Sequence, residues 1–585
     1  MGGSVERSAR ERRPAFTGCF GGRMGRSRVC GGMLVAALAV LPGAGAWAQQ
    51  VRGQGAVPTP QQLNPSQQLP SQPRARSDIF LAPEPGPCPL RDSKLTFELK
   101  GVSFTGAAGV AAKSLDQAFK GRVGQTIPVA EICDIRDRAA AILFSKGILA
   151  RVEIPAQRIA EGQLQLDVIE AHIAGVNFHG DAGAAEAKVE AYLERLRGLT
   201  PLNLNTAQRF LLLAADVPGV QISAVIRPSA EGRGAVDLDV TVSRSVLSVA
   251  ANVQNYGSQA LGPWAALGRV DLKGLTAYGD QSAVVLYSTL DFDEQRIVQV
   301  MEDLRPGSSG LIVRGSLSYA WSNPRGALTP LKLRGTALDA EFSGDYPIIR
   351  RRRTNLNLIA GLAIVDQNTD FASGGTLIDD KLRVGYLRLD GGIRRTLFGL
   401  PFEGELGLEA RKGFEALGAS RMGDLALSRA SGDPSALIGR ADGHVTLALS
   451  RWVQPYVGFQ AQYSRTPLLS YEQMAVGNLT IGRGYDPSSV EGDRGVAGAF
   501  EARFIPLRLP GGFSVSAYGF YDIAYVAYVD SIQDTTVRSA GGGVRIAAPR
   551  GIDLDLFYAT PFDRPTPSAP SIPTPRVMLS LTYRR

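Results

Sequence analysis

Histidine and cysteine are both scarce in this chain of 585 residues. The three histidines, His172, His179 and His444, are scattered, and no G-x-S-x-G, H-E-x-x-H or catalytic pair of carboxylates accompanies them. Together with four cysteines they offer too few ligands at suitable spacing for a metal site. We therefore expect no enzymatic activity, no cofactor and no metal, and we expect the histidines to have structural or surface roles.

Long apolar runs are also missing. After Gln49 no stretch of about 18 apolar residues occurs, so no transmembrane helix is expected there, and a membrane protein of this sequence must be a closed barrel. A shorter apolar run, residues 33–41, follows several arginines and precedes a small-x-small site at residues 46–48. This pattern predicts a secretory signal peptide over residues 1–48.

Charge is modest, at 20% of residues, and the net charge of +8 is spread along the chain rather than gathered in one basic tract. A nucleic-acid partner is therefore not expected. Glycine, in contrast, is abundant, with 67 residues. Gly-rich, Tyr-bearing sequence without long apolar runs is typical of many turns and alternating strands.

Residues 49–89 are rich in Gln, Pro and Ser and lack periodic apolar positions. They are predicted to form a flexible, extended linker. The prolines of this segment make a stable helix improbable.

In residues 90–173 the periodicity predicts the order strand, helix, helix, strand, strand. Two helices on a small sheet are an unlikely setting for an enzyme's cleft, whereas the sheet edge offers unpaired N–H and C=O groups that can accept an incoming strand. The segments are alternating residues 94–104, helical spacing over residues 111–119 and 129–144, and alternating residues 149–154 and 164–169.

Residues 245–585 are a train of alternating segments of roughly ten residues, such as residues 282–291 and 513–526. At about 21 residues per strand and turn, this length accommodates about sixteen antiparallel strands, a size that leaves an aqueous channel. A soluble all-β domain would explain the alternation as well. The export signal and the continuation of the pattern to the last residues favour a membrane β-barrel.

Several motifs carry a resemblance to a known family. The tetrapeptide IPAQ at residues 154–157, followed by a G-x-L-x-L-x-V strand, resembles the first POTRA domain of two-partner secretion transporters, the exporters of haemolysin and filamentous haemagglutinin. Residues 198–229 resemble the second POTRA domain of that family, which implies a second small α+β domain over residues 174–244. Residues 255–258 and 346–356 resemble barrel segments of the family, so we expect the arginines 350–353 at a membrane rim or on the lumen wall.

The most informative motif is VGNLTIGRGYDPSSVEGDRG at residues 476–495. It resembles the Arg-Gly-aromatic loop that folds back into the barrel lumen of these transporters and is held there by an acidic residue of the wall. The resemblance assigns that lock to Arg483, Gly484, Tyr485 and Asp522. Alternation puts Asp522 on the lumen face, since an aspartate facing lipid would be costly.

Two positions depart from the family pattern beside this lock. Gly482 replaces a commoner aliphatic residue, and Ala524 replaces a glycine. The resemblance therefore leaves the local conformation of the loop open.

For partner recognition we expect a client strand to pair with the sheet edge over residues 149–154. The partner-binding residues are then Leu149, Val152 and Ile154, with Ile142 and Phe144 of the preceding helix lining a groove. Core positions are the alternative for the helix residues.

Two cysteines, Cys88 and Cys133, remain after removal of the signal peptide. An even count in an exported chain suggests one disulfide closing a loop of about 45 residues, worth roughly 3 to 4 kcal/mol. Two buried free thiols are the alternative.

The leading hypothesis is an outer-membrane transporter of a Gram-negative bacterium with its POTRA domains in the periplasm. It would export one large client, such as a β-helical adhesin or haemolysin. Its other partners would be outer-membrane lipids and the barrel-assembly machinery, and not nucleic acid. A factor that inserts other barrels is the alternative, and a passive porin would leave residues 89–244 unexplained.

Overall fold

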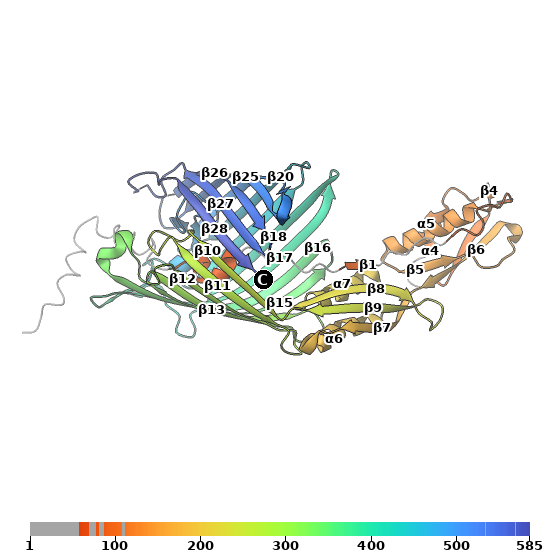
Figure 1. The fold of residues 1–585 in the computed structure, drawn as a ribbon, viewed down its shortest axis with the longest axis horizontal. Coiled ribbons are helices and arrows are strands. Elements are labelled where there is room, and N and C mark those ends of the chain that lie inside the picture. The colour runs from red at the N-terminus through yellow and green to blue at the C-terminus, as the bar shows by residue number, and fades with distance from the viewer. Residues whose placement is uncertain (1–57, 70–77, 81–86, 108–111, 533, 568) are drawn as a thin grey trace, which may run out of the picture. The chain divides into compact units, whose positions relative to one another are not determined.

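The computed structural model describes residues 58–69, 78–80, 87–107, 112–532, 534–567 and 569–585. The predicted signal peptide lies outside these ranges. Two small α+β domains precede a closed antiparallel barrel (Figure 1). Within the described part of the chain, no helix has both the length and the hydropathy needed to cross a membrane.

The first α+β domain packs its helices against a sheet of strand order β3-β6-β5, with β3 parallel and β5 antiparallel to β6. Because side chains alternate along a strand, Val152, Leu164 and Leu166 point to the same side of the sheet and pack against the apolar face of α5. This is the predicted order of elements, with β5 at the sheet edge. The elements are β2 Thr96–Glu98, β3 Gly101–Thr105, α4 Ala112–Leu115, η2 Asp116–Phe119, β4 Thr126–Pro128, α5 Glu131–Ser145, β5 Ala150–Glu153, η3 Ala160–Gly162 and β6 Gln163–Glu170.

The second α+β domain repeats this topology, since β7 lies parallel and β8 antiparallel to β9. Asn203 caps α7 by accepting hydrogen bonds from the amides of residues 205 and 206. A short strand from the predicted linker, β1, pairs in parallel with β8. The elements are β1 Asp78–Phe80, β7 His172–Gly180, η4 Gly183–Ala185, α6 Glu186–Arg197, α7 Leu204–Ala215, β8 Val220–Pro228 and β9 Ala235–Arg244.

The barrel has sixteen antiparallel strands and closes where β28 pairs with β10. The two-residue strand β24 lies in the turn between β23 and β25 and pairs with β25, so it is not counted among the sixteen. The predicted strand number is confirmed. The strands are β10 Leu247–Gln254, β11 Ala265–Lys273, β12 Gln281–Thr289, β13 Gln295–Leu304, β14 Ile312–Ser322, β15 Leu333–Arg350, β16 Thr354–Phe371, β17 Thr376–Leu397, β18 Leu400–Gly413, β19 Leu437–Leu447, β20 Val453–Ser464, β23 Arg494–Phe504, β24 Leu507–Arg508, β25 Ser514–Ala527, β26 Asp534–Ala548, β27 Ile552–Pro561 and β28 Arg576–Arg584.

Side chains alternate between the lumen and the outer face along these strands. In β25, Phe520 and Asp522 are buried, whereas Tyr521 and Ile523 are exposed. The outward set is apolar, as a lipid-facing surface requires. The aspartate therefore projects into the lumen.

The two ends of the barrel are distinguished by their connections. Strand β10 follows β9 after only a short connection, and the strands alternate in direction, so every second turn returns to the end at which the α+β domains are attached. We call this end the domain-side rim and the opposite end the far rim. The turns of the domain-side rim are residues 274–280, 305–311, 351–353, 398–399, 448–452, 505–513 and 549–551.

Part of the predicted linker is folded. Residues 58–69 contain the one-turn helix α3 Pro60–Leu63 and the 3-10 turn η1 Pro65–Gln68. The expectation of extended chain is wrong here, because Pro60 and Pro65 each occupy the first position of a helical turn, where a missing N–H costs nothing. Leu63 is fully buried against lumen residues of the barrel.

Candidate functional site in the barrel lumen

The connection between β20 and β23 folds back into the lumen. It contains η6 Ser470–Glu472 and a small hairpin of β21 Met474–Val476 and β22 Val490–Gly492. Val476 and Tyr485 of this loop pack with Ala497, Ala524 and Val537 of the wall. These wall residues belong to β23, β25 and β26, so the loop lies against one sector of the barrel.

Arg483 joins the loop to two carboxylates of the wall. Its Nε and Nη2 donate to the two oxygens of Asp522 at 2.9 and 2.6 Å, and its backbone amide donates to the same carboxylate at 2.9 Å. Its Nη1 donates to Glu501 at 2.5 Å. The guanidinium also lies over the Phe520 ring, with 3.7 Å from Cζ to the centroid. This forked geometry with a cation–π contact is what an arginine offers and a lysine does not.

Glu501 is the wall residue that the sequence motif did not identify. It lies on β23 with its side chain 3% exposed and also pairs with Arg503 and Arg545. The available signal was the alternation of β23, which places Ala497, Ala499 and Glu501 on the lumen face. Arg483 therefore bridges two neighbouring strands of the wall, whereas the motif indicated one.

The residues next to Arg483 explain how the loop approaches the wall so closely. Gly482 has a φ of +116°, a conformation that an aliphatic side chain would strain. Gly484 leaves no space for a Cβ, which would lie 2.8 Å from the Cβ of Ser539. Tyr485 is fully buried, and its hydroxyl donates to the carbonyl oxygen of Arg538 at 2.9 Å. Both glycines are thus required by the observed backbone.

The same connection is anchored by two further arginine–carboxylate sets. Glu472 accepts from Arg411 at 2.8 Å and from Arg440 at 2.7 Å. Asp493, from the end of the motif, is fully buried and accepts from Arg429 at 2.6 Å. Because Arg429 belongs to the far-rim loop between β18 and β19, that loop is tied to the lumen loop.

Asp339 of β15 contacts both lumen segments. Its Oδ2 accepts from the Tyr471 hydroxyl at 3.0 Å and from the Asn64 side-chain amide at 3.2 Å. Gln299 and Gln367 also hold the segment 58–69, through Asn64 and the carbonyl oxygen of Pro58. The amino-terminal segment and the lumen loop therefore share one acceptor on the wall.

The predicted partner-binding residues divide into two groups. Ile142 and Ile154 are half-buried beside the first-domain core, and Phe144 is 41% exposed. Val152 is buried, because alternation points it into the sheet's covered face. Leu149 forms backbone hydrogen bonds with residues 171 and 202 of the domain junction. The backbone of Leu149 is therefore already paired and the side chain of Val152 points into the domain, so the free edge is β5 Ala150–Glu153, and partner binding there stays a prediction.

A cross-domain contact lies beside this edge. Arg233 of the second domain pairs with Glu153 at 2.6 Å and with Asp167 at 3.5 Å. A hydrogen bond from the Thr105 hydroxyl, supported by Arg233, lowers the pKa of the Asp167 carboxyl. Gln157 of the IPAQ segment bonds the backbone of Gln165 in both directions, so its amide extends the pairing of β6.

Cys88 and Cys133 are joined in a disulfide, with 5.8 Å between their Cα atoms. Cys133 lies in the first turn of α5, so the bridge ties the start of the first domain to its main helix. Among the described residues, no group of three His, Cys, Asp or Glu side chains is arranged to hold a metal ion.

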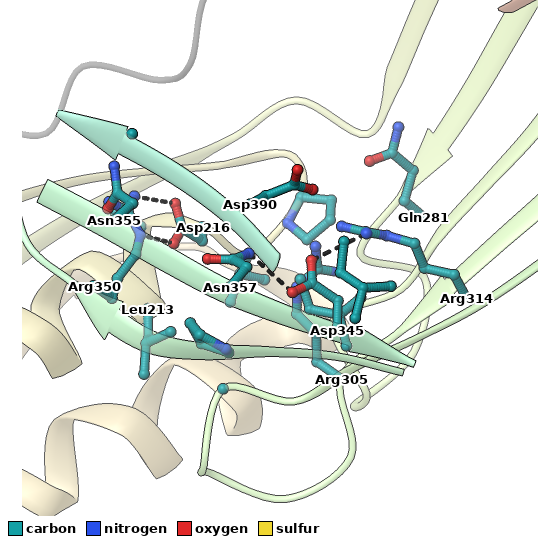
Figure 2. Close-up of a pocket in the computed structure, with 18 of the residues that line it drawn as sticks. Leu213, Asp216, Gln281, Arg305, Arg314, Asp345, Arg350, Asn355, Asn357 and Asp390 are labelled. Carbon is teal, nitrogen blue, oxygen red and sulfur yellow. Dashed lines mark hydrogen bonds and ion pairs between the residues drawn. The ribbon is translucent and has the colours of Figure 1, made fainter. Parts of the chain in front are cut away.

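The second α+β domain contacts the domain-side rim through ion pairs. Arg350, at the end of β15, makes a bidentate pair with Asp216, which follows α7, with both distances 2.6 Å (Figure 2). Arg314 and Asn357 meet at Asp345 on the neighbouring wall (Figure 2). These residues line a cavity of about 920 Å³ at the junction. Of the arginines at residues 350–353, Arg350 thus lies at the mouth of the lumen, and the other three form a turn of the domain-side rim.

These features define a class of protein: an outer-membrane β-barrel preceded by POTRA domains, with a lumen loop tied to the wall. Residues 97–171 match the ShlB-type POTRA domain. The chain belongs to the family described as haemolysin secretion/activation protein ShlB/FhaC/HecB, which matches residues 232–546. The family consists of two-partner secretion transporters of Gram-negative outer membranes.

Solved structures show the same fold. CdiB from Escherichia coli has a TM-score of 0.71 and 16% identity, over 93% of this chain and 99% of that one. CdiB from Acinetobacter baumannii has a TM-score of 0.60 and 16% identity, over 96% of this chain and 100% of that one. A comparison with curated protein sequences found no match.

Proposed function

We propose that this protein is an outer-membrane pore that binds an unfolded secreted partner through its POTRA domains and passes it to the cell surface. The observation that carries the proposal is the lumen loop held by Arg483 against Asp522 and Glu501. A passive porin would leave the two POTRA domains and the amino-terminal segment in its channel unexplained. A transporter that stays closed until a client arrives accounts for both.

The POTRA domains lie in the periplasm in this proposal, and the far rim faces the outside. A client would meet the edge strand β5 first, where a strand can be added by backbone pairing. Phe144 and Ile154 flank this edge and provide partly exposed apolar surface. Backbone pairing suits an unfolded client, because it does not depend on one particular side-chain sequence.

Passage of the client then requires the segments that occupy the lumen to leave it. Both the segment 58–69 and the loop with Arg483 occupy it, and each is held by hydrogen bonds to charged or polar wall residues. Such polar contacts can be exchanged for water or for client backbone. The sequence contains no G-x-x-x-x-G-K-[ST] nucleotide motif, so folding of the client outside the cell is the proposed driving force.

The decisive experiment deletes this protein and follows a very large secreted protein encoded by a neighbouring reading frame. We expect that client to be trapped in the periplasm while other outer-membrane barrels are inserted normally. Undisturbed export would overturn the proposal. A general loss of other barrels with client export intact would instead indicate an assembly factor.

Recognition is tested separately by photo-crosslinking. A benzoylphenylalanine at position 144 should crosslink the trapped client, whereas one at Glu194, an exposed position of α6, should not. Equal crosslinking from both positions would contradict recognition at the β5 edge.

A further inference from the structure

Of five consecutive turns of the domain-side rim, four carry positive charge and none carries negative charge. The five turns connect β15 to β16, β17 to β18, β19 to β20, β23 to β25, and β26 to β27, so they form one continuous sector around the barrel. None of them contains Asp or Glu. Their arginines are Arg351, Arg352, Arg353, Arg451, Arg508 and Arg550, all of them exposed.

The rest of this rim is covered by the second POTRA domain. Lys188 donates to the carbonyl oxygen of Gly307 at 2.8 Å, and Arg209 donates to that of Ser309 at 3.2 Å. At the boundary of the sector, Arg350 pairs with Asp216. The described part of the chain gives Arg353, Arg508 and Arg550 no ion pair, so their charge is available to an external ligand.

Exposed apolar side chains alternate with these arginines. Phe398 at the β17–β18 turn is 93% exposed, and Trp452 at the β19–β20 turn is 64% exposed. Leu507 is next to Arg508 in the β23–β25 turn and is 64% exposed. The guanidinium of Arg451 lies over the Trp452 ring at 4.9 Å. This mixture of aromatic and basic residues is typical of the membrane interface rather than of open solvent.

The sector continues the apolar outer face of the barrel. Leu389 and Leu408, on the strands that end at these turns, are exposed on that face. A group bound at the rim therefore lies beside lipid chains. The far rim is mixed, since its turn at residues 290–294 carries three carboxylates and no basic residue, whereas other far-rim turns carry arginines such as Arg325 and Arg421.

We propose that this basic sector binds the phosphate head groups of anionic phospholipids, such as phosphatidylglycerol, in the adjoining membrane leaflet. Guanidinium groups make forked hydrogen bonds to phosphate oxygens, and the apolar neighbours insert between acyl chains at the same depth. Assignment of that leaflet to the periplasmic face rests on the proposed function. Lipid binding itself does not.

Trp452 provides a probe at the site. Of the four tryptophans, one lies in the predicted signal peptide, so W264F/W321F leaves Trp452 as the only tryptophan of the processed chain. The full chain is reconstituted in phosphatidylcholine vesicles containing a fixed fraction of brominated phosphatidylglycerol or, separately, of brominated phosphatidylcholine. Quenching of Trp452 then reports which lipid is enriched next to the rim.

We expect brominated phosphatidylglycerol to quench more strongly, and the excess to fall as salt rises. In the same background, R451A/R508A/R550A should lower the relative affinity for phosphatidylglycerol by about 100-fold, taking the usual contribution of each basic residue near an anionic surface. The control R421A/R465A/R564A removes three exposed far-rim arginines and should retain the excess. Equal quenching by the two lipids, or an unchanged excess in R451A/R508A/R550A, would overturn the proposal.

This result is independent of client export. Loss of export in the deletion strain with no lipid preference would leave the transporter proposal intact and remove the lipid site. A lipid preference in a protein whose deletion leaves export normal would support the lipid site and overturn the transporter proposal.

Discussion

Replacement of Arg483 by alanine tests how the lumen loop is held. The substitution removes two side-chain hydrogen bonds to Asp522 and one to Glu501. Asp522 is 1% exposed and keeps only the amide of residue 483 as a donor from the loop. Removing one partner of a buried ion pair costs about 3 to 5 kcal/mol. The ratio of docked to undocked loop should therefore fall by at least about 150-fold.

Hydrogen exchange measures this change directly. The amides of residues 483–485 are all hydrogen-bonded when the loop is docked, to Asp522, to Ser539 and to the carbonyl oxygen of Gly482. Their exchange in the purified barrel should accelerate by roughly the same factor. Export of the client should be lost while the barrel still inserts, since the loop no longer holds its place beside β23 and β25.

Two variants serve as comparisons for Arg483→Ala. Arg483→Lys keeps the charge but not the fork, so its exchange rates should be intermediate. Arg494→Ala removes an exposed arginine at the start of β23 and should leave exchange unchanged. Unaltered protection of residues 483–485 in Arg483→Ala, or normal client export by that variant, would refute the reasoning.

Three further predictions follow from the same structure. Gly484→Ala places a Cβ against Ser539, so it should undock the loop and reproduce the rapid exchange of Arg483→Ala; normal protection would show that the wall can yield. Replacing both Cys88 and Cys133 by serine should destabilise the first POTRA domain by roughly 3 to 4 kcal/mol, seen as faster exchange in α5, and equal exchange in the two proteins would contradict a stabilising bridge. Deleting residues 58–69 should raise the single-channel conductance in planar bilayers, because a buried segment leaves the lumen; an unchanged conductance would exclude it as an obstruction.

Much of the fold was predictable from periodicity. Strand alternation is a strong local signal, and it located the barrel, its strand number and the lumen side of Asp522. The helical turns of the segment 58–69 were not predicted, because proline was taken to disrupt a helix at every position. Pro60 and Pro65 begin helical turns, where proline is favoured.

The site was only partly accessible to sequence reasoning. The Arg-Gly-Tyr motif identified the arginine of the ion pair, and the resemblance identified Asp522 as its acidic partner. Glu501 belongs to no recognisable motif. Its role arises from barrel closure, which brings β23 beside β25. The pairing of the Leu149 backbone with the second domain was not predictable for a related reason, since contact with a neighbouring domain is not encoded in a strand's own pattern.

Asp339 gives the two lumen segments a common thermodynamic fate. It is 6% exposed and accepts hydrogen bonds from Asn64 of one segment and Tyr471 of the loop connection. Departure of either segment removes one of the donors to this buried carboxylate, so the two segments are energetically coupled through it. By reciprocity, the coupling free energy is the same whichever segment leaves first. The two segments should therefore leave the channel as linked events rather than independent ones.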